Sequence, residues 1–333
     1  MKPAAITALL LFALLAFSAG LCAQPNDPFT NNRLPGPYNT LREWAELLPG
    51  MTWPAITGVQ QGPDGNLYVL GRCHENSCAG RTEPAMLIYN TSGKLVNSWG
   101  AGLFNFPHGF LICANGNVWI SDAQIGGGKG NQVFKFSKDG KLLLTLGKAG
   151  ASGTGSDVFD QPTAIAIGHD GDIFVAEGHS PGYGNSRIVK FSKDGKLLQV
   201  IGKKGRGPGE FMGPHGLAID SQGRLFVADR GNNRLQILDQ NGKFIAEWRQ
   251  FGRPSGVFID KNDIVYVADS TSSDKVNPGY KQGIRIGSVK DGKVTAFIPW
   301  SEGNTLEGVA ADDSGNVYGG FTNTLNFRRF VKK

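Results

Sequence analysis

Two histidines and one glutamate occupy matching positions in widely separated parts of the chain. His108 and His215 each stand in a Pro-His-Gly triplet, and Glu307 stands in the similar triplet Leu-Glu-Gly. Two imidazoles and a carboxylate that converge would form a three-ligand metal site with open positions. The alternative is that each histidine forms only a hydrogen bond in a narrow polar channel. The choice depends on the elements that position these side chains.

The triplets belong to an internal repeat. Each copy contains a short apolar strand, a Gly-containing turn and a second strand that ends near an acidic residue. Corresponding residues lie 51, 55, 52, 40 and 52 positions apart by subtraction, which suits one four-stranded propeller blade per copy. The corresponding residues of the six copies are Thr57, His108, Thr163, His215, Ser255 and Glu307.

The last copy differs from the others in its second half. Five copies contain a turn that ends in Gly-Lys, usually Asp-Gly or Asn-Gly, which favours a tight hairpin. The sixth has no such turn and ends with Asn326 to Val331 as its third strand. An unpaired edge is a liability, so we expect Tyr38 to Leu48 to supply the fourth strand, with Trp44 placed like Trp99. The sequence predicts an all-β fold, a six-bladed β-propeller closed by an N-terminal strand; an open arc of blades is the alternative.

The first strand of a propeller blade lines the central channel. The six corresponding residues should therefore point toward the axis, with His108, His215 and Glu307 on alternate blades and hydroxyl side chains on the other three. These three candidate metal ligands would lie about 120° apart around the axis of a six-bladed ring.

The same face should hold a second set of functional side chains. Arg72 and Arg230 follow equivalent second strands, and Tyr183 lies in the long loop Glu177 to Arg187. Arginine can hold a carboxylate through two hydrogen bonds, and tyrosine can transfer a proton, so this set suits an anionic, carbonyl-bearing ligand. Acidic residues at the ends of second strands are expected to be structural, bonding to loop backbone: Asp122, Glu177, Asp229 and Asp269. Three further histidines lie outside the repeat register and are expected to be loop residues: His74, His169 and His179.

The repeats resemble the NHL family from about Thr52 to the C-terminus, most closely over Gly207 to Ile237. The chain also resembles the lyase domain of peptidylglycine α-amidating enzymes, a six-bladed propeller that splits peptidyl-α-hydroxyglycine into a peptide amide and glyoxylate. The Pro-His-Gly triplets match the first two zinc-ligand motifs of that family, and the Tyr-x-Asn-Ser-Arg-Ile-Val stretch matches its catalytic tyrosine segment. The resemblance implies that Tyr183, Arg72 and Arg230 are catalytic and that the protein is a carbon–nitrogen lyase.

The third motif departs from the family pattern. Pro-His-Asp of the family reads Leu306-Glu307-Gly308 here, so a zinc histidine becomes Glu307 and an aspartate tied to calcium becomes Gly308. Glutamate can replace histidine as a zinc ligand, although it lowers the Lewis acidity of the metal. We therefore expect Zn²⁺ and regard Ca²⁺ as doubtful.

The N-terminus is typical of a targeting segment. Lys2 precedes an almost wholly apolar run from Ile6 to Gly20, followed by small residues and a polar stretch. We predict a signal peptide at 1–23, an N-terminal extension at 24–37 and the propeller at 38–333, with secretion or periplasmic localisation. Lipid anchoring at Cys22 is the alternative, but the bulky Leu21 before it does not suit a lipoprotein site.

Three cysteines remain after that segment. In an oxidising compartment Cys73 and Cys78 could form a disulfide, and Cys113, within an apolar run, is expected to be a buried free thiol.

The partner predictions follow from charge and hydropathy. The net charge of +6 is not gathered into a basic stripe, which argues against nucleic acid, and no segment after the leader is apolar enough to span a membrane. We expect a monomer with a small-molecule or peptide ligand on the channel face. Two alternatives are a non-catalytic NHL propeller that binds a peptide or glycan there, and a gluconolactonase-like hydrolase, which would need more channel carboxylates.

Overall fold

The computed structural model describes residues 27–41, 44–155, 157–179, 182–300, 305–323 and 326–333. The expected signal peptide at 1–23, including Cys22, lies outside the described residues. None of the helices in the described ranges has the length and apolar character that a bilayer span requires.

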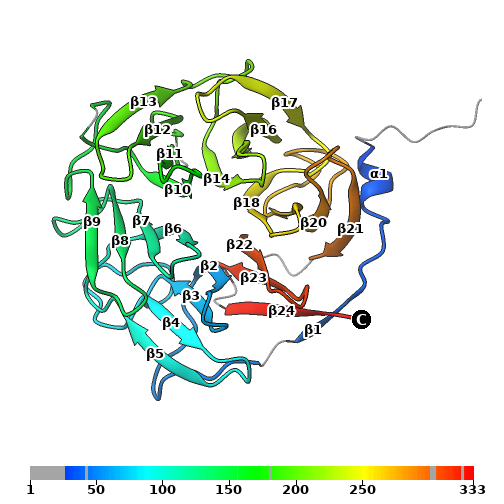
Figure 1. Ribbon diagram of the computed structural model, residues 1–333. Helices are drawn as coiled ribbons and strands as arrows, with labels where there is room; N and C mark the ends of the chain where they lie inside the picture. Colours follow the sequence, from blue (N-terminus) through cyan, green and yellow to red (C-terminus); the bar gives the residue numbers. More distant parts are fainter. Residues whose placement is uncertain (1–26, 42–43, 156, 180–181, 301–304, 324–325) are drawn as a thin grey trace, which may run out of the picture.

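The described residues form six antiparallel sheets of four strands each, arranged as blades in a ring (Figure 1). Blade 1 contains β2 (Ile56–Gln61), β3 (Leu67–Gly71), β4 (Met86–Tyr89) and β5 (Leu95–Trp99). Blade 2 contains β6 (Pro107–Ile112), β7 (Val118–Asp122), β8 (Gln132–Phe136) and β9 (Leu142–Leu146). Blade 3 contains β10 (Pro162–Ile167), β11 (Ile173–Glu177), β12 (Arg187–Phe191) and β13 (Leu197–Ile201).

The second half of the ring repeats this order. Blade 4 contains β14 (Pro214–Ile219), β15 (Leu225–Asp229), β16 (Arg234–Leu238) and β17 (Phe244–Trp248), with the 3₁₀ helix η1 (Arg230–Asn232) after β15. Blade 5 contains β18 (Pro254–Ile259), β19 (Ile264–Asp269), β20 (Gly283–Ser288) and β21 (Val294–Pro299). Blade 6 contains β22 (Leu306–Ala311), β23 (Val317–Phe321), β24 (Asn326–Lys332) and β1 (Tyr38–Leu41). The short helix α1 (Pro28–Asn31) precedes β1.

The predicted six-bladed, all-β propeller is therefore confirmed, and its hydrophobic core lies between the blades. All five residues of β7, β11 and β15 are buried, because each second strand is covered on both faces by the neighbouring blades. The Gly-Lys turns also behave as predicted. Gly93, Gly140, Gly195, Gly242 and Gly292 all have positive φ, which glycine adopts at little cost.

Each innermost strand begins with a bulge that aims one residue at the axis. In blade 4, Pro214 pairs with Asp229 and Gly216 with Ala228, which leaves His215 as the extra residue. The same shift occurs at the start of the innermost strand of every other blade. The following glycines lie very close to the next blade: a Cβ on Gly216 would lie 2.8 Å from the Ser255 carbonyl oxygen.

The ring closes through the N-terminal strand, as predicted, but this strand is shorter than expected. Strand β1 pairs antiparallel with β24, and Tyr38 lies opposite Lys332. The pairing ends at Leu41, and Trp44 does not occupy the fourth-strand position of Trp99. Instead the Trp44 ring packs against Tyr89 of blade 1 and Tyr318 and Phe327 of blade 6. The aromatic contacts between two blades thus draw the chain away from the sheet edge.

The N-terminal segment also contacts blade 5 before it reaches blade 6. The Asn32 side-chain oxygen accepts a hydrogen bond from Arg285 Nη2 at 2.9 Å, and the Phe297 amide donates to the Pro35 carbonyl at 3.2 Å. Beyond β1, the Glu46 amide donates to the Gly93 carbonyl of blade 1 at 3.0 Å. Residues 32–41 and 44–46 therefore contact three blades, and we call them the strap (Figure 1).

We predict that Trp44→Ala weakens ring closure. Truncating a fully buried tryptophan costs about 3–5 kcal/mol, and the half-buried Trp44 should cost about 2–3 kcal/mol because it leaves Tyr89, Tyr318 and Phe327 without their shared partner. Thermal unfolding followed by circular dichroism should show a melting temperature several degrees lower. The control is Val96→Ala on the exposed outer strand of blade 1, which should change stability by no more than about 0.5 kcal/mol. Equal melting temperatures for the two variants would contradict the strap.

Candidate metal centre

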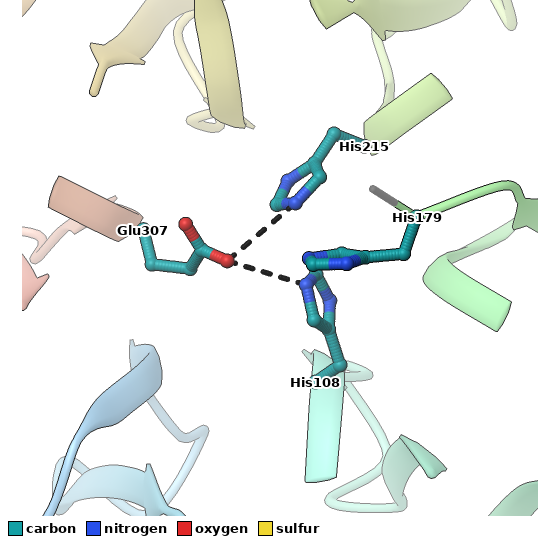
Figure 2. Close-up of side chains that lie close together, drawn as sticks. All are labelled: His108, His179, His215 and Glu307. Atoms are coloured by element: carbon teal, nitrogen blue, oxygen red, sulfur yellow. Dashed lines mark ion pairs between the residues drawn. The ribbon is translucent and has the colours of Figure 1, made fainter. Parts of the chain in front are cut away.

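Four potential metal ligands converge at the channel axis (Figure 2). His108, His215 and Glu307 come from the bulges of β6, β14 and β22, and His179 follows β11. One donor atom from each lies within 4.8 Å of all the others. Glu307 Oε1 is 3.2 Å from His108 Nε2 and 3.5 Å from His215 Nε2. The structure thus brings together all three residues that the repeat pattern selected.

Carbonyl oxygens of the neighbouring blades orient both channel imidazoles. His108 Nδ1 lies 2.8 Å from the Thr163 carbonyl oxygen, and His215 Nδ1 lies 3.2 Å from that of Ser255. A carbonyl can only accept, so Nδ1 carries the proton in each ring and Nε2 keeps its lone pair. This is the arrangement by which proteins fix a histidine as a metal ligand.

The protonation states of the cluster residues favour binding of a cation. Both Nε2 atoms are buried and face Glu307 Oε1, and neither forms a hydrogen bond with any other group among the described residues. Burial lowers the pKa of His108 and, together with Arg230, holds the pKa of His215 well below its usual value, so neither ring readily takes a second proton. Burial alone would raise the pKa of Glu307, but His215, His108 and Arg230 outweigh it and hold that pKa well below its usual value. Neutral imidazoles facing a carboxylate are the protonation states that a divalent metal requires.

The donor set limits the choice of metal. Imidazole nitrogens with one carboxylate oxygen suit zinc, and two histidines with one carboxylate also suit iron(II). A calcium cage would need six to eight oxygen ligands.

The residues that line the channel also favour a zinc or iron(II) site over a calcium site. Its cavity of about 390 Å³ extends from the metal cluster along the innermost strands. Its wall is largely aliphatic beyond the cluster, and Glu307 is the carboxylate residue among those that line it. A gluconolactonase-like set of several channel carboxylates is not present in the described residues that form this wall.

His179 was missed by the sequence analysis, which treated it as a loop residue. Its ring centroid lies 4.9 Å from that of His108 and 5.3 Å from that of His215. The repeat pattern selects only residues of the innermost strands, whereas His179 belongs to a loop. A signal was nevertheless present in the sequence. Arg72 and Arg230 each directly follow a second strand, and His179 lies one residue further from the end of its own second strand.

Two buried arginines add positive charge beside the cluster. Arg72 stacks on Phe106, with Cζ 3.6 Å from the ring centroid, and its Nη2 lies 4.0 Å from Glu307 Oε1. That Nη2 atom is buried and has no hydrogen-bond partner among the described residues. Burial lowers the pKa of Arg72 to about 10, with Glu307 opposing and Arg230 adding to the shift. The two guanidiniums therefore face the same space, and with Glu307 they leave a net positive charge that suits an anionic ligand.

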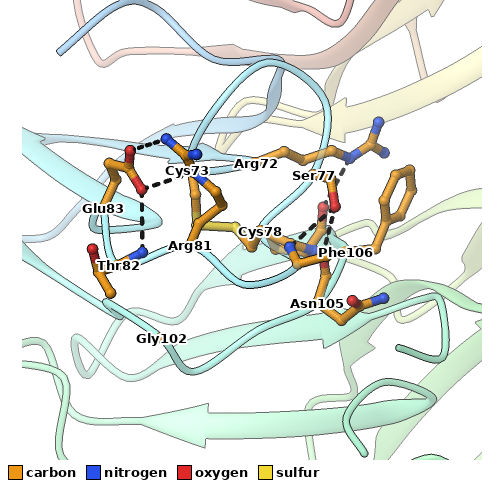
Figure 3. The surroundings of a disulfide bond; sticks show 12 residues. Arg72, Cys73, Ser77, Cys78, Arg81, Thr82, Glu83, Gly102, Asn105 and Phe106 are labelled. Carbon is orange, nitrogen blue, oxygen red and sulfur yellow. Dashed lines mark hydrogen bonds and ion pairs between the residues drawn. A yellow bond between two sulfur atoms is a disulfide. The ribbon is translucent and has the colours of Figure 1, made fainter. Parts of the chain in front are cut away.

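A disulfide holds the loop that carries Arg72 (Figure 3). Cys73 and Cys78 are bonded, as predicted, with their Cα atoms 5.0 Å apart. Cys73 has φ of 56°, a left-handed conformation that costs a non-glycine residue energy. The Cys78 amide donates to the Asn105 carbonyl at 3.0 Å, and Arg72 Nε donates to the Pro107 carbonyl at 3.2 Å, which ties the loop to blade 2.

Tyr183 lies at the rim of the same face. A Cβ on Gly213 would lie 2.4 Å from Tyr183 Cδ1, so the ring packs directly on the glycine that precedes the Pro-His-Gly triplet of blade 4. Tyr183 is also close enough to Arg230 for their charges to interact. Tyr183 therefore packs beside the segment that carries His215, within range of the Arg230 charge.

The acidic residues at the ends of second strands are structural, as predicted. Asp122 accepts from the Asn105 and Phe106 amides, and Asp229 accepts from the Met212 amide. Glu177 and Asp269 likewise accept from backbone amides in their own blades. The expectation for Cys113 was only partly right: it is free of the disulfide, but it is half-buried at the channel wall.

Comparison with known proteins agrees with this architecture. The NHL repeat family matches residues 211–238, within blade 4. The chain folds as a six-bladed β-propeller, and it is similar to proteins named for NHL repeats and for α-amidation. It is 34% identical to NHL repeat-containing protein 3 of Mus musculus over 192 residues, covering 56% of this chain and 52% of the relative.

Two further relatives carry names from amidation chemistry. The chain is 35% identical to peptidyl-glycine alpha-amidating monooxygenase B of Xenopus laevis over 250 residues, covering 69% of this chain and 26% of the relative. It is 35% identical to peptidyl-alpha-hydroxyglycine alpha-amidating lyase 1 of Drosophila melanogaster over 181 residues, covering 50% of this chain and 32% of the relative. The chain thus spans about half or less of the length of these relatives.

We predict that the purified protein carries about one divalent ion per chain and that His215→Ala abolishes this binding. The variant loses a buried nitrogen donor that no other residue of β14 can replace. Elemental analysis for zinc and iron after gel filtration measures the metal content. The matched control is Thr163→Ala, which keeps the backbone carbonyl that orients His108 and should retain the metal. Metal-free wild-type protein would show that the histidines serve only as hydrogen-bonding groups.

We also predict that the disulfide positions Arg72. Replacing both Cys73 and Cys78 by serine should cost about 2 kcal/mol of stability, since the bridged loop is short. It should also weaken the affinity for a carboxylate ligand such as glyoxylate about tenfold, measured by calorimetry, while metal content stays unchanged. Cys113→Ser is the control and should leave carboxylate affinity as in the wild type. Unaltered glyoxylate affinity in the double variant would show that the loop holds its shape without the bridge.

Proposed function

We propose that the protein is a metal-dependent lyase that cleaves a peptidyl-α-hydroxyglycine, or a similar carbinolamide, to an amide and glyoxylate. The observation that carries this proposal is the pair of buried guanidiniums, Arg72 and Arg230, beside a cluster of donor atoms that needs a cation. Relatives named for α-amidation support the same reaction class.

The arginines would bind the carboxylate that leaves with glyoxylate. Arg72 offers a buried Nη2 that has no hydrogen-bond partner among the described residues, and Arg230 lies near enough to help lower the pKa of Arg72. A carboxylate between them would offset their mutual repulsion and would accept charge-assisted hydrogen bonds. Because both side chains are buried, water competes little for these donors.

The reaction needs one proton to move and no oxidant. The substrate hydroxyl loses its proton as the carbon–oxygen double bond forms, the carbon–nitrogen bond breaks, and the departing amide nitrogen takes up a proton. Tyr183 is the candidate for the proton transfer, because its ring lies at the rim beside Arg230 and the glycine before His215. The neighbouring guanidinium would stabilise the phenolate that forms in between.

His108, His215 and Glu307 would hold the metal, for which zinc is our first choice. When bound there, a divalent ion would polarise the substrate hydroxyl and ease its deprotonation.

We further propose that the protein acts outside the reducing cytosol, secreted or in the periplasm. The Cys73–Cys78 disulfide supports this proposal, because such bonds persist in oxidising compartments. The predicted signal peptide at 1–23 points in the same direction.

We predict that the metal-loaded protein releases glyoxylate from a peptidyl-α-hydroxyglycine and that Tyr183→Phe or Arg230→Ala slows release about 10²–10⁴-fold, the usual cost of losing a proton-transfer or charge-stabilising group. Glyoxylate is measured by coupling to a dehydrogenase. The control is Lys275→Ala, an exposed cation in the corresponding loop of blade 5, which should keep the wild-type rate.

Glu307→His provides a second test of the chemistry. It exchanges a carboxylate for a neutral ligand, which should raise the Lewis acidity of the metal and increase any weak lyase rate. If both metal-loaded proteins fail to release glyoxylate, the lyase proposal is wrong, and a propeller that binds a peptide or glycan becomes the better explanation.

A further inference from the structure

His179 differs from the other three cluster members in how it is held. His108, His215 and Glu307 project from bulges of the innermost strands, and their side chains are at most 7% exposed. His179 is half-buried and lies in the loop after β11 (Figure 2). It therefore reaches the cluster from a loop and is not among the residues that line the channel cavity, whereas the other three belong to the channel wall.

The described residues on the two sides of His179 lie against each other. Gly178, directly before it, has φ of 129°, and a Cβ there would lie 2.5 Å from the Tyr183 carbonyl oxygen. The Ser186 hydroxyl donates to that same carbonyl at 2.6 Å. Tyr183 and Ser186 both have positive φ, which costs a non-glycine residue about 1 kcal/mol or more. A single strained loop thus carries both His179 and Tyr183.

The base of this loop is firmly attached. Glu177 accepts hydrogen bonds from Asn185 Nδ2 at 3.0 Å and pairs with Arg187 at the start of β12. The Ser186 hydroxyl also accepts from the Gly213 amide at 3.1 Å, next to the triplet that carries His215. The ends of the loop are fixed, so a change in His179 can occur while the blade remains intact.

We propose that His179 is a fourth, displaceable ligand of the metal, which closes the site at rest and gives way when a substrate oxygen binds. This inference rests on the proposed metal centre and goes beyond the three-ligand set. Three nitrogens and one oxygen complete a tetrahedral zinc sphere, and such a sphere has no open position. A substrate can reach the ion only if one protein ligand leaves or a fifth position forms.

Of the four ligands, His179 is the one whose backbone lies outside the strands. His108 and His215 are each held through Nδ1 by a carbonyl of the adjacent blade, and Glu307 lies buried among both imidazoles and Arg72. Their backbones belong to the sheets, so moving them would disturb the packing between blades. Displacement of His179 needs a change in a loop and not in a sheet, and it would free the position on the metal that His179 occupied.

The test uses the full-length protein with Co²⁺ in place of the native metal, since its visible spectrum reports the ligand number. His179→Ala should still bind one Co²⁺, with a changed spectrum and at least tenfold weaker metal affinity. Azide should bind the cobalt of this variant at least tenfold more tightly than that of the wild type, because it no longer competes with His179. Added imidazole should restore a spectrum close to that of the wild type. His169→Ala, an exposed histidine outside the cluster, should match the wild type in every measurement.

The outcomes separate this inference from the lyase proposal. A His179→Ala protein with the wild-type cobalt spectrum and azide affinity overturns the ligand role, whatever its activity. A changed spectrum in a protein that never releases glyoxylate leaves the ligand role standing and refutes only the reaction. If wild-type protein binds no Co²⁺, both fall. With an active protein, His179→Ala should lower KM several-fold, because the substrate no longer has to displace a bound ligand.

Discussion

The architecture of the ring and of the candidate metal site depends on the close approach of neighbouring innermost strands. A Cβ on Gly109 would lie 2.6 Å from the Thr163 carbonyl oxygen, so only glycine allows blades 2 and 3 to meet at this point. The same carbonyl accepts the Nδ1 proton of His108. One contact therefore sets both the width of the ring and the face that the imidazole turns toward the axis. Blades 4 and 5 repeat the arrangement with Gly216, Ser255 and His215.

Odd- and even-numbered blades contribute different kinds of side chain at the channel axis. Hydroxyl side chains of the odd-numbered blades form structural hydrogen bonds, and the even-numbered blades supply candidate metal ligands. Thr57 and Thr163 use their hydroxyls to donate to Pro107 and Pro214 carbonyls of the following even-numbered blades, at 3.5 Å and 2.6 Å. These hydrogen bonds satisfy the hydroxyl groups of Thr57 and Thr163 within the channel wall. The even-numbered blades instead direct two imidazole nitrogens and one carboxylate toward one another at the axis, with Glu307 Oε1 within 3.5 Å of both Nε2 atoms. The wall is thereby stable, while the centre retains the capacity to bind a cation.

Sheets and loops contribute differently to the site. The bulges fix His108, His215 and Glu307 through backbone pairing that extends across each blade, whereas Arg72, His179 and Tyr183 lie on loops at the rim. The loop residues need separate supports: a disulfide beside Arg72, and a folded turn with a buried Glu177–Arg187 pair beneath His179 and Tyr183. A rigid wall with an adjustable rim suits a site that must hold an ion and still admit a ligand.

The sequence alone determined those features that repeat. Strand order, blade number, the tight Gly-Lys turns and the six axial positions follow from local patterns that recur at a regular interval, and the missing last turn was enough to predict closure by an N-terminal strand. The tertiary structure decided those features that do not recur from blade to blade. Only the folded ring shows that Trp44 leaves the sheet edge for an aromatic contact between two blades, and that Cys113 stays half-buried at the channel wall. His179 joins the cluster although it comes from a loop, because residues of blades 2, 3, 4 and 6 meet at the axis, and no local pattern encodes that meeting.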